Sequence, residues 1–351
     1  MTSIIYVGMD VHTTNYTLCC YSMEDDRFFA EVQVEPDAKN ILKYLARIEK
    51  QQSRGCRIVC GYEAGCLGYS LYHQLHAHGI DCVILAPTTM MTKPCKRIKT
   101  DRRDARLISK CLAFHTYSPV YIPTEVDDAV KEYIRMRDDA NSALARVKQQ
   151  IIAFCIRHGK IHDGKSYWTN KHLEWLSSLD LGNKILSEVL QEYLIRYYQL
   201  REQVDMYDMR INELAQAEPY RQKVEKLGCF RGIAAHTALS FCVEVGDFRR
   251  FATAQQFASY LGLVPGECSS GDKQQYTGIT KAGNSHLRKL LVETAQVFGR
   301  SATKSGKSVA LKERQAKCDS LTVAYADKAN ARLKKKYFKI AMRSKVNIAK
   351  T

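Results

Sequence analysis

The sequence predicts a mixed α/β domain at the N-terminus, a long helical region in the middle and a mainly helical C-terminal domain. Three observations lead to this prediction. Short apolar runs alternate with helical patterns over residues 3–113, no proline occurs from residue 124 to residue 218, and glycine-rich turns separate helical segments in residues 221–300. A chain of 351 residues is long enough for two or three domains.

The N-terminal domain begins with three apolar runs that predict an antiparallel meander. Two further strands alternate with helical patterns. Strands are expected at residues 3–11, 16–22, 28–34, 57–63 and 82–86, and helices at residues 37–50 and 67–78. Another helix is expected in the second half of residues 93–113, where the apolar positions have helical spacing. This order of elements indicates a mixed sheet flanked by helices.

The central region carries a heptad pattern in which apolar residues alternate spacings of four and three. Its members are Leu186, Leu190, Tyr193, Tyr197, Leu200, Val204, Tyr207, Ile211 and Leu214. Such a seam favours a coiled coil over an amphipathic helix packed on its own domain. Its partner is either the helix expected near residues 126–157 of the same chain or a helix of another subunit.

The pattern divides the chain into four regions. They are an α/β domain at residues 1–123, a helical coiled-coil region at 124–218, a C-terminal domain at 219–300 and a basic helical tail at 301–351. In the C-terminal domain, helices are expected at Thr237–Val245, at Ala254–Leu261 and from Ser285 onward. The tail has nine basic residues and no acidic one between Lys328 and Thr351. A charge run of this kind is commonly a solvated face, but beside nucleic acid it would neutralise phosphates.

The overall charge indicates a polyanionic partner. Lys and Arg number 53 against 37 Asp and Glu, so the formal net charge is +16. No apolar run approaches the roughly 20 residues that a membrane span needs, and the N-terminus lacks the basic start of a secretory signal. Nucleic acid is therefore a stronger expectation than membrane. The 13 cysteines include no CxxC pair, which argues against a structural zinc site and indicates free, buried thiols in a reducing cytoplasm.

Four carboxylates stand out by their positions. Asp10 ends the first strand, Glu63 ends a later buried strand, and Asp101 and Asp104 lie three apart at the start of a helix. Converging carboxylates repel one another and require a cation, and oxygen ligands suit Mg²⁺ or Mn²⁺. Two such ions form a clamp for phosphodiester chemistry. In the alternative reading, Asp10 starts a turn and Asp101 is an N-cap with Asp104 as a first-turn acid.

The residues around the Asp101–Asp104 pair favour the metal over the alternative. They are Lys93, Lys96, Arg97, Lys99, Arg102, Arg103 and Arg106. Carboxylates inside a basic patch indicate metal-dependent chemistry on a nucleic-acid backbone.

A second candidate site is the glycine-rich loop at residues 262–285. Ser269 and Ser270 precede Gly271, and Lys273 and Lys281 flank them. Asn284 is a candidate N-cap for the helix that carries His286, Arg288 and Lys289. Helix N-termini and basic side chains bind phosphate, and a serine there could attack phosphorus. By itself this pattern favours an ordinary turn, because serine before glycine is common in turns.

These motifs together resemble one family. YVGMDVH with Asp10, GYEAG with Glu63, and KTDRRDAR with Asp101 and Asp104 resemble the DEDD catalytic set of a RuvC-like transposase domain. GLVPGECSSG and TKAGNSHLR resemble the C-terminal domain of the same family. From about residue 4 to about residue 300, the chain resembles the DEDD insertion-sequence transposases, whose members include bridge-RNA-guided recombinases.

The resemblance implies a fold and a mechanism. The fold would be an α/β RuvC/RNase H-like domain, then a helical coiled coil, then a mainly α C-terminal transposase domain. Asp10, Glu63, Asp101 and Asp104 would be catalytic and would hold Mg²⁺, with Mn²⁺ as a substitute. Ser270 would be the nucleophile that forms a phosphoserine link to DNA, with Ser269 in reserve. The two domains would form a composite site, and the coiled coil would hold a dimer.

The resemblance also implies partners. A structured noncoding guide (bridge) RNA would pair with target and donor DNA, and the protein would form a dimer, or a tetramer on DNA, in the nucleoid rather than at a membrane. Residues expected to bind nucleic acid are Lys99, Arg102, Arg103, Lys273, Lys281, Arg288 and Lys289. Two other classes remain open. A RuvC-like metal-dependent nuclease or junction resolvase would hydrolyse DNA with the carboxylates alone, and a basic RNA-binding scaffold would have inert carboxylates.

Overall fold

The protein is described by a computed structural model that covers two compact units, residues 1–122 and 123–351. The structure describes residues 3–52, 55–65, 67–90, 100–267, 275–300, 306–344 and 348–349. Each unit is taken by itself below. No helix within these described ranges is both long enough and apolar enough to span a lipid bilayer.

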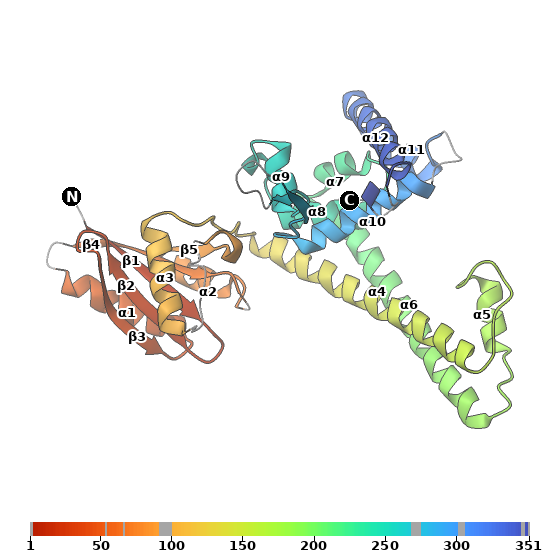
Figure 1. Ribbon diagram of the computed structural model, residues 1–351, viewed down its shortest axis with the longest axis horizontal. Helices are drawn as coiled ribbons and strands as arrows, with labels where there is room; N and C mark the ends of the chain where they lie inside the picture. The colour runs from red at the N-terminus through yellow and green to blue at the C-terminus, as the bar shows by residue number, and fades with distance from the viewer. Residues whose placement is uncertain are drawn as a thin grey trace. The chain divides into compact units, whose positions relative to one another are not determined.

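The N-terminal unit is a mixed sheet with helices on it (Figure 1). Its strands are β1 (Ser3–Val11), β2 (Tyr16–Ser22), β3 (Arg27–Val34), β4 (Cys56–Glu63) and β5 (Asp81–Leu85), and its helices are α1 (Ala38–Gln51), α2 (Ser70–Ala77) and α3 (Asp101–Ala113). The strand order is β3-β2-β1-β4-β5. The first three strands are antiparallel, whereas β4 runs parallel to β1 and β5. The predicted meander and the mixed sheet are confirmed.

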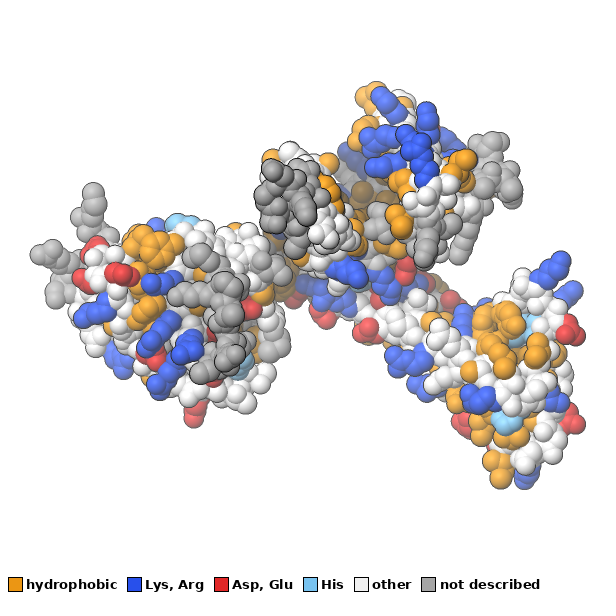
Figure 2. Space-filling view, in the orientation of Figure 1, with side chains coloured by type: hydrophobic (Ala, Val, Ile, Leu, Met, Phe, Trp, Pro, Cys, Tyr) orange, Lys and Arg blue, Asp and Glu red, His pale blue; other side chains and the backbone are white. Residues whose placement is uncertain are grey.

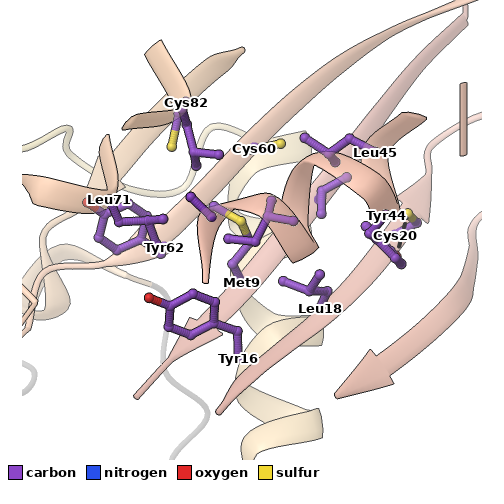
Figure 3. Packing of buried hydrophobic residues seen from close by; sticks show 14 of the residues in the cluster. Met9, Tyr16, Leu18, Cys20, Tyr44, Leu45, Cys60, Tyr62, Leu71 and Cys82 are labelled. Carbon is purple, nitrogen blue, oxygen red and sulfur yellow. Dashed lines mark hydrogen bonds between the residues drawn. The ribbon is translucent and has the colours of Figure 1, made fainter. Parts of the chain in front are cut away.

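The alternation of side chains along the strands gives the sheet two covered faces. Val7 and Met9 of β1 point to the face covered by α1 and α2, where Leu45 and Leu71 pack on them. Figure 3 shows this packing, with Met9 and Leu18 of the sheet near Tyr44 and Leu45 of α1. The opposite face is covered by α3, whose Ile108 and Leu112 pack with Tyr6 and Leu85.

Two glycines let α3 lie directly on the sheet. A Cβ atom at Gly8 would be 2.0 Å from the carbonyl oxygen of Ala105 and 2.4 Å from the backbone nitrogen of Ser109. A Cβ atom at Gly61 of the neighbouring strand would be 2.8 Å from side-chain atoms of Leu112. Backbone therefore meets backbone at Gly8, which no other residue type would allow.

The second unit is built on two long helices and a cluster of shorter elements (Figure 1). The long helices are α4 (Glu125–Arg157) and α6 (Lys184–Gln216). The shorter elements are α5 (Asn170–Ser177), α7 (Arg221–Gly228), α8 (Ala235–Val245), α9 (Ala254–Tyr260), β6 (Pro265–Glu267), β7 (Tyr276–Ile279), α10 (Ser285–Arg300), α11 (Val309–Gln315) and α12 (Ser320–Ala341).

The heptad seam of α6 packs against α4 of the same chain. Leu190, Tyr197 and Val204 share one buried cluster with Val147 and Ile151 of α4. Farther along, Ile211 and Ala215 pack near Val130 and Ile134. The two helices therefore form an antiparallel hairpin, and the intrachain partner of the two foreseen is the one observed. Leu190, Tyr197, Val204 and Ile211 of the seam are buried and its other members are half-buried, and a dimer held through this region stays a prediction.

Several short elements were not predicted. The helix α5 lies in the segment of the chain that connects α4 to α6. Its N-cap is Thr169, whose hydroxyl accepts a hydrogen bond from the backbone of His172, and aromatic rings at its start and within it pack together. The two-stranded pair of β6 and β7 lies inside the loop that was predicted only as a turn-rich segment.

The cysteines behave as predicted within the described part of the chain. All those described are free thiols, and most are buried. Burial raises the pKa of the Cys20 thiol to about 11 and that of Cys82 to about 12. These thiols therefore stay protonated at neutral pH and pack as small apolar groups.

Replacing Gly8 with alanine should displace α3 from β1. We expect Gly8→Ala to lower the free energy of unfolding by about 1–3 kcal/mol or more, because the new methyl group overlaps backbone atoms that cannot rotate away. Urea unfolding of the full chain measures this change. Gly65→Ala is the matched control, since its Cβ would meet only the carbonyl oxygen of Glu63 at 3.8 Å. Equal stability of the two variants would contradict the close packing.

Candidate active site

The parallel pairing of β1 and β4 places two of the predicted carboxylates side by side. The register pairs Gly8 with Gly61 and Met9 with Tyr62, so Asp10 and Glu63 follow at the carboxyl ends of adjacent strands. Both residues continue the alternation of the two glycines. They therefore lie on the sheet face that α3 covers.

The start of α3 brings the other two carboxylates to the same end of the sheet. Thr100 is the N-cap of α3, so Asp101 and Asp104 both belong to its first turn rather than one of them capping it. Asp10 lies two residues beyond Gly8, roughly 6.6 Å along the strand. Asp101 lies four residues before Ala105, roughly 6 Å back along the helix. Because Ala105 contacts Gly8, these two similar distances bring Asp101 to the same place as Asp10.

The structure assembles a group of three side chains that could hold a metal ion. Ligand atoms of Asp10, His12 and Asp101 all lie within 4.8 Å of one another. The Nε2 atom of His12 is 3.3 Å from Oδ2 of Asp10. The sequence analysis placed His12 only in a turn. The signal was its spacing, because a residue two beyond Asp10 on an extended segment points to the same side.

Electrostatics show that this group carries unbalanced negative charge. Burial raises the pKa of Asp10, the nearby His12 lowers it, and the charges of Asp104 and Asp101 raise it further. The Oδ2 atom of Asp10 is buried, and its polar contact among the described residues is the long one to Nε2 of His12 at 3.3 Å. A divalent cation fits this position, because it would neutralise the repulsion and satisfy the buried oxygen.

Glu63 and Asp104 stand outside this group. Glu63 lies at the same edge and on the same face, but its side chain is exposed. Asp104 acts on Asp10 through its charge. Of the four predicted carboxylates, the structure thus brings two together with a histidine and keeps two nearby. Which of the four hold metal stays a prediction.

The basic residues near α3 have different surroundings. Arg106 donates to Oε2 of Glu31 at 2.7 Å, and Nε of Arg102 lies 3.3 Å from Oε1 of the same carboxylate. The side chain of Arg102 is nevertheless 77% exposed, so it remains accessible to a phosphate. Lys99 lies outside the described residues.

The glycine-rich loop of the second unit is fixed at its base. Ser269, Ser270 and Lys273 lie outside the described residues. Gly262 and Gly283 have φ values of +65° and +76°. Added Cβ atoms would lie 2.0 Å from the carbonyl oxygen of Ala282 and 2.1 Å from that of Tyr260. Only glycine accommodates both the backbone conformation and the close approach.

The helix that follows the loop begins at a well-connected N-cap. The side-chain oxygen of Asn284 accepts from the backbone of Leu287 at 3.0 Å, as the sequence predicted, and its amide donates to Oε2 of Glu244 at 2.9 Å. Glu244 also accepts from Arg135 of α4. Arg288 donates to the carbonyl oxygens of Leu261 at 2.8 Å and Ala282 at 3.2 Å.

The three basic residues of this region therefore differ. Arg288 holds the loop base through two carbonyl groups, whereas Lys281 and Lys289 have exposed side chains. The two lysines are therefore accessible to a phosphate, whereas the guanidinium group of Arg288 is engaged in holding the loop base. All three remain predicted nucleic-acid contacts.

A half-buried ionic cluster lies beside the start of α10. Oδ1 of Asp138 is 2.9 Å from Nε2 of His236, and its Oδ2 is 3.7 Å from Nε2 of His286. Burial raises the pKa of Asp138, but His236 and Arg137 outweigh it and hold the pKa below its usual value. Burial lowers the pKa of His286 despite the opposing charges of Glu244 and Asp138. The cluster ties the starts of α8 and α10 to α4.

Removing the charge of Asp10 should have opposite effects on stability and on metal binding. Since the folded-state pKa of Asp10 is raised, its ionised form destabilises the fold at neutral pH, and the cost disappears only as the pH falls below that pKa. We expect Asp10→Asn to unfold at a higher temperature than the wild type without divalent ions. Added Mg²⁺ or Mn²⁺ should stabilise the wild type, by about 2.7 kcal/mol at a hundredfold excess over Kd, and not the variant.

Thermal unfolding with and without the ions measures both effects. Glu49→Gln removes a charge from an exposed position of α1 and should respond to the ions as the wild type does. An ion-induced shift in Asp10→Asn as large as that of the wild type would remove Asp10 from the metal group.

Acid should destabilise the second unit through His286. Its folded-state pKa is lowered, so the unfolded chain binds the proton first and stability is lost as the pH falls through about 6.5. We expect the difference in unfolding free energy between the wild type and His286→Gln to shrink from pH 7.5 to pH 5.5, by at most about 1.4 kcal/mol per pH unit. Urea unfolding over this range measures it. A difference that is independent of pH would show that His286 titrates equally in both states.

Comparisons with known proteins match both units. The family profile described as "Transposase", of the DEDD IS110 type, matches residues 7–156, and the profile "Transposase IS116/IS110/IS902 family" matches residues 225–314. The first match contains the metal group, and the second contains the glycine-rich loop.

Similar proteins cover nearly the whole chain. The transposase for insertion sequence element IS1533 from Leptospira borgpetersenii is 32% identical over 340 residues, which is 95% of each chain. The putative transposase y4qE from Sinorhizobium fredii is 34% identical over 284 residues, 81% of this chain and 69% of that protein. With this identity over this length, and with both profiles matched in order, the chain belongs to the IS110 family of DEDD insertion-sequence transposases.

Proposed function

We propose that this transposase cuts and rejoins DNA through a phosphoserine intermediate, with a divalent metal held by its N-terminal unit and with a structured noncoding RNA as guide. The observation that carries the proposal is the group formed by Asp10, His12 and Asp101 at one end of the sheet. In a chain of this family, a negatively charged group beside exposed cations suits chemistry on a phosphodiester.

In this proposal the N-terminal unit is a RuvC/RNase H-like domain that binds the cation. Asp10 and Asp101 would hold Mg²⁺ or Mn²⁺, and Glu63 and Asp104 would complete the negative field. The bound ion would supply stabilisation of charge on the phosphate oxygens. His12, whose Nε2 atom is 3.3 Å from Oδ2 of Asp10, would contribute a ring nitrogen to the same group.

The serine of the second unit would be the nucleophile. Ser270 is the proposed residue and Ser269 the reserve. A serine hydroxyl is a weak nucleophile at neutral pH and needs activation by a base or a metal. In the transfer, the bond from serine oxygen to phosphorus forms as the bond to the leaving sugar oxygen breaks. The phosphodiester energy is conserved, so a strand can be rejoined without ATP, which hydrolysis by water would not permit.

Guidance by RNA would leave sequence choice to base pairing, while the protein holds backbones. The proposed contacts are Lys99, Arg102, Arg103, Lys273, Lys281 and Lys289. Exposed Lys and Arg side chains contact phosphates and carry no sequence information themselves. Arg288 would support the loop rather than touch a phosphate, since its guanidinium group already donates to two carbonyl oxygens.

Hydrolysis alone is the second candidate function. It is favoured by one observation, namely that Asp10, His12 and Asp101 all belong to the N-terminal unit. A nuclease or resolvase acting in this way would not need Ser270, and so the serine decides between the two functions.

Covalent capture of DNA should depend on Ser270. Wild-type protein with labelled DNA, Mg²⁺ and the RNA that copurifies with it should give a protein–DNA adduct on a denaturing gel. Ser270→Ala should lose the adduct because it removes the attacking oxygen, and Ser269→Ala should keep it. Asp101→Asn should lose both adduct and nicks. Peptide mapping of the adduct identifies the residue.

The other outcomes decide against the proposal. An adduct that survives in Ser270→Ala and maps to Ser269 or a tyrosine would move the nucleophile. Nicks without any adduct, in every variant, would favour the hydrolytic nuclease. Adducts that form equally well without RNA would argue against guidance.

A further inference from the structure

The helix α12 has one buried face and one strongly basic face. Ala326 and Tyr337 are buried, and Asn330 on the same side accepts from the backbone of Arg231 at 3.0 Å. On the other side lie cations with exposed side chains. They are Lys328, Arg332, Lys335, Lys336, Lys339 and Arg343. Figure 2 shows Lys and Arg side chains gathered over α12.

Helical geometry makes these cations a continuous stripe. At 3.6 residues per turn, positions 328, 332, 335, 339 and 343 follow one another by three or four residues and share one side of the helix. Ala326 and Tyr337, eleven residues apart, define the opposite side. The stripe, from Lys328 to Arg343, spans 15 residues, or roughly 22 Å.

The stripe has no acidic counterpart. Within the described residues, no carboxylate lies within 4.0 Å of any of its six cations. The single acid of α12, Asp327, points elsewhere and contacts Lys307 at 2.5 Å and Gln315 at 3.0 Å. Like charges three and four apart destabilise a helix. A polyanion on this face would reverse that effect.

The same residues line a shallow hollow large enough for a backbone segment. Its volume is about 550 Å³. Its walls carry five of the six cations, together with Ile340 and Ser344. Phosphate groups of a nucleic acid match this lining in charge and in repeat.

We propose that the α12 stripe binds the phosphate backbone of duplex DNA. The stripe contains only Lys and Arg, without the Asn or Gln side chains that read base edges, so it contacts backbone. One exposed aromatic residue, Tyr325, lies a turn before Lys328, and none lies between Lys328 and Arg343. Single-strand sites use successive aromatic stacking platforms, and the duplex is therefore the better fit. The choice of DNA rests on the proposed function.

The test measures binding of the full-length protein to a duplex DNA by fluorescence anisotropy, over a range of salt concentrations and in EDTA so that nothing is cut. The variant Lys335→Gln, Lys336→Gln, Lys339→Gln removes three stripe charges while keeping helix propensity. We expect its affinity at 0.1 M salt to fall on the order of a hundredfold and its salt slope to fall by roughly 2–3 units.

A matched control removes the same charge elsewhere. Lys39→Gln, Lys43→Gln, Lys50→Gln changes three exposed lysines of α1 and should leave affinity and slope close to those of the wild type. Circular dichroism of both variants checks that their helix content is unchanged. An equal loss in the control would show a general charge effect and overturn the stripe as a site.

Other probes separate this inference from the proposed function. If the stripe variant binds duplex DNA as the wild type does, the inference fails and the proposed function stands. If the loss appears with single-stranded DNA or duplex RNA and not with duplex DNA, the partner is misassigned. If the wild type binds no DNA, even with its copurified RNA, the proposed function fails and takes the inference with it.

Discussion

The approach of α3 to β1 at Gly8 is the contact on which the candidate metal group depends. Because Gly8 has no Cβ atom, the helix lies on the strand backbone, with the carbonyl oxygen of Ala105 at the point of contact. From that point the strand and the helix run to Asp10 and Asp101 over nearly equal lengths. The carboxylates are thus placed by two rigid elements rather than by a loop, which suits a group that must hold its geometry against its own charge.

The negative charges of the candidate metal group and the positive charges of the second unit have different surroundings. Asp10 is partly buried and is repelled by the charges of its neighbours, which lowers the stability of the N-terminal unit. A bound cation would restore that stability. In the second unit, the cations that hold the fold together are paired or donate to carbonyl oxygens, as with Arg137 on Asp208 and Arg288 on the loop base. The cations of the α12 stripe have no such internal use. The structure therefore separates cations that support the fold from cations left for a partner.

Sequence patterns predicted those parts of the fold that repeat with a period. The strands and helices of the N-terminal unit and the seam of α6 follow from apolar spacing, and the mixed sheet was confirmed. The partner of the seam could not be predicted, because an a/d pattern is the same whether the facing helix belongs to one chain or two. The strands β6 and β7 have three and four residues, too few for any period to show. The helix α5 was missed, although the similarly short α9 was expected.

The candidate site was predictable to the extent that it depends on strand ends and helix starts. Asp10 and Asp101 follow from such positions, and His12 continues the two-residue alternation one residue past the end of β1, a signal that the sequence analysis did not use. The cluster of Asp138, His236 and His286 joins three helices that are far apart in sequence, and nothing local marks it. The cluster nevertheless bears on the candidate site, because Asn284 and His286 fix the start of α10, the helix that follows the glycine-rich loop. The base of that loop is therefore anchored to α4 and α8 through Asn284, Glu244 and Arg135.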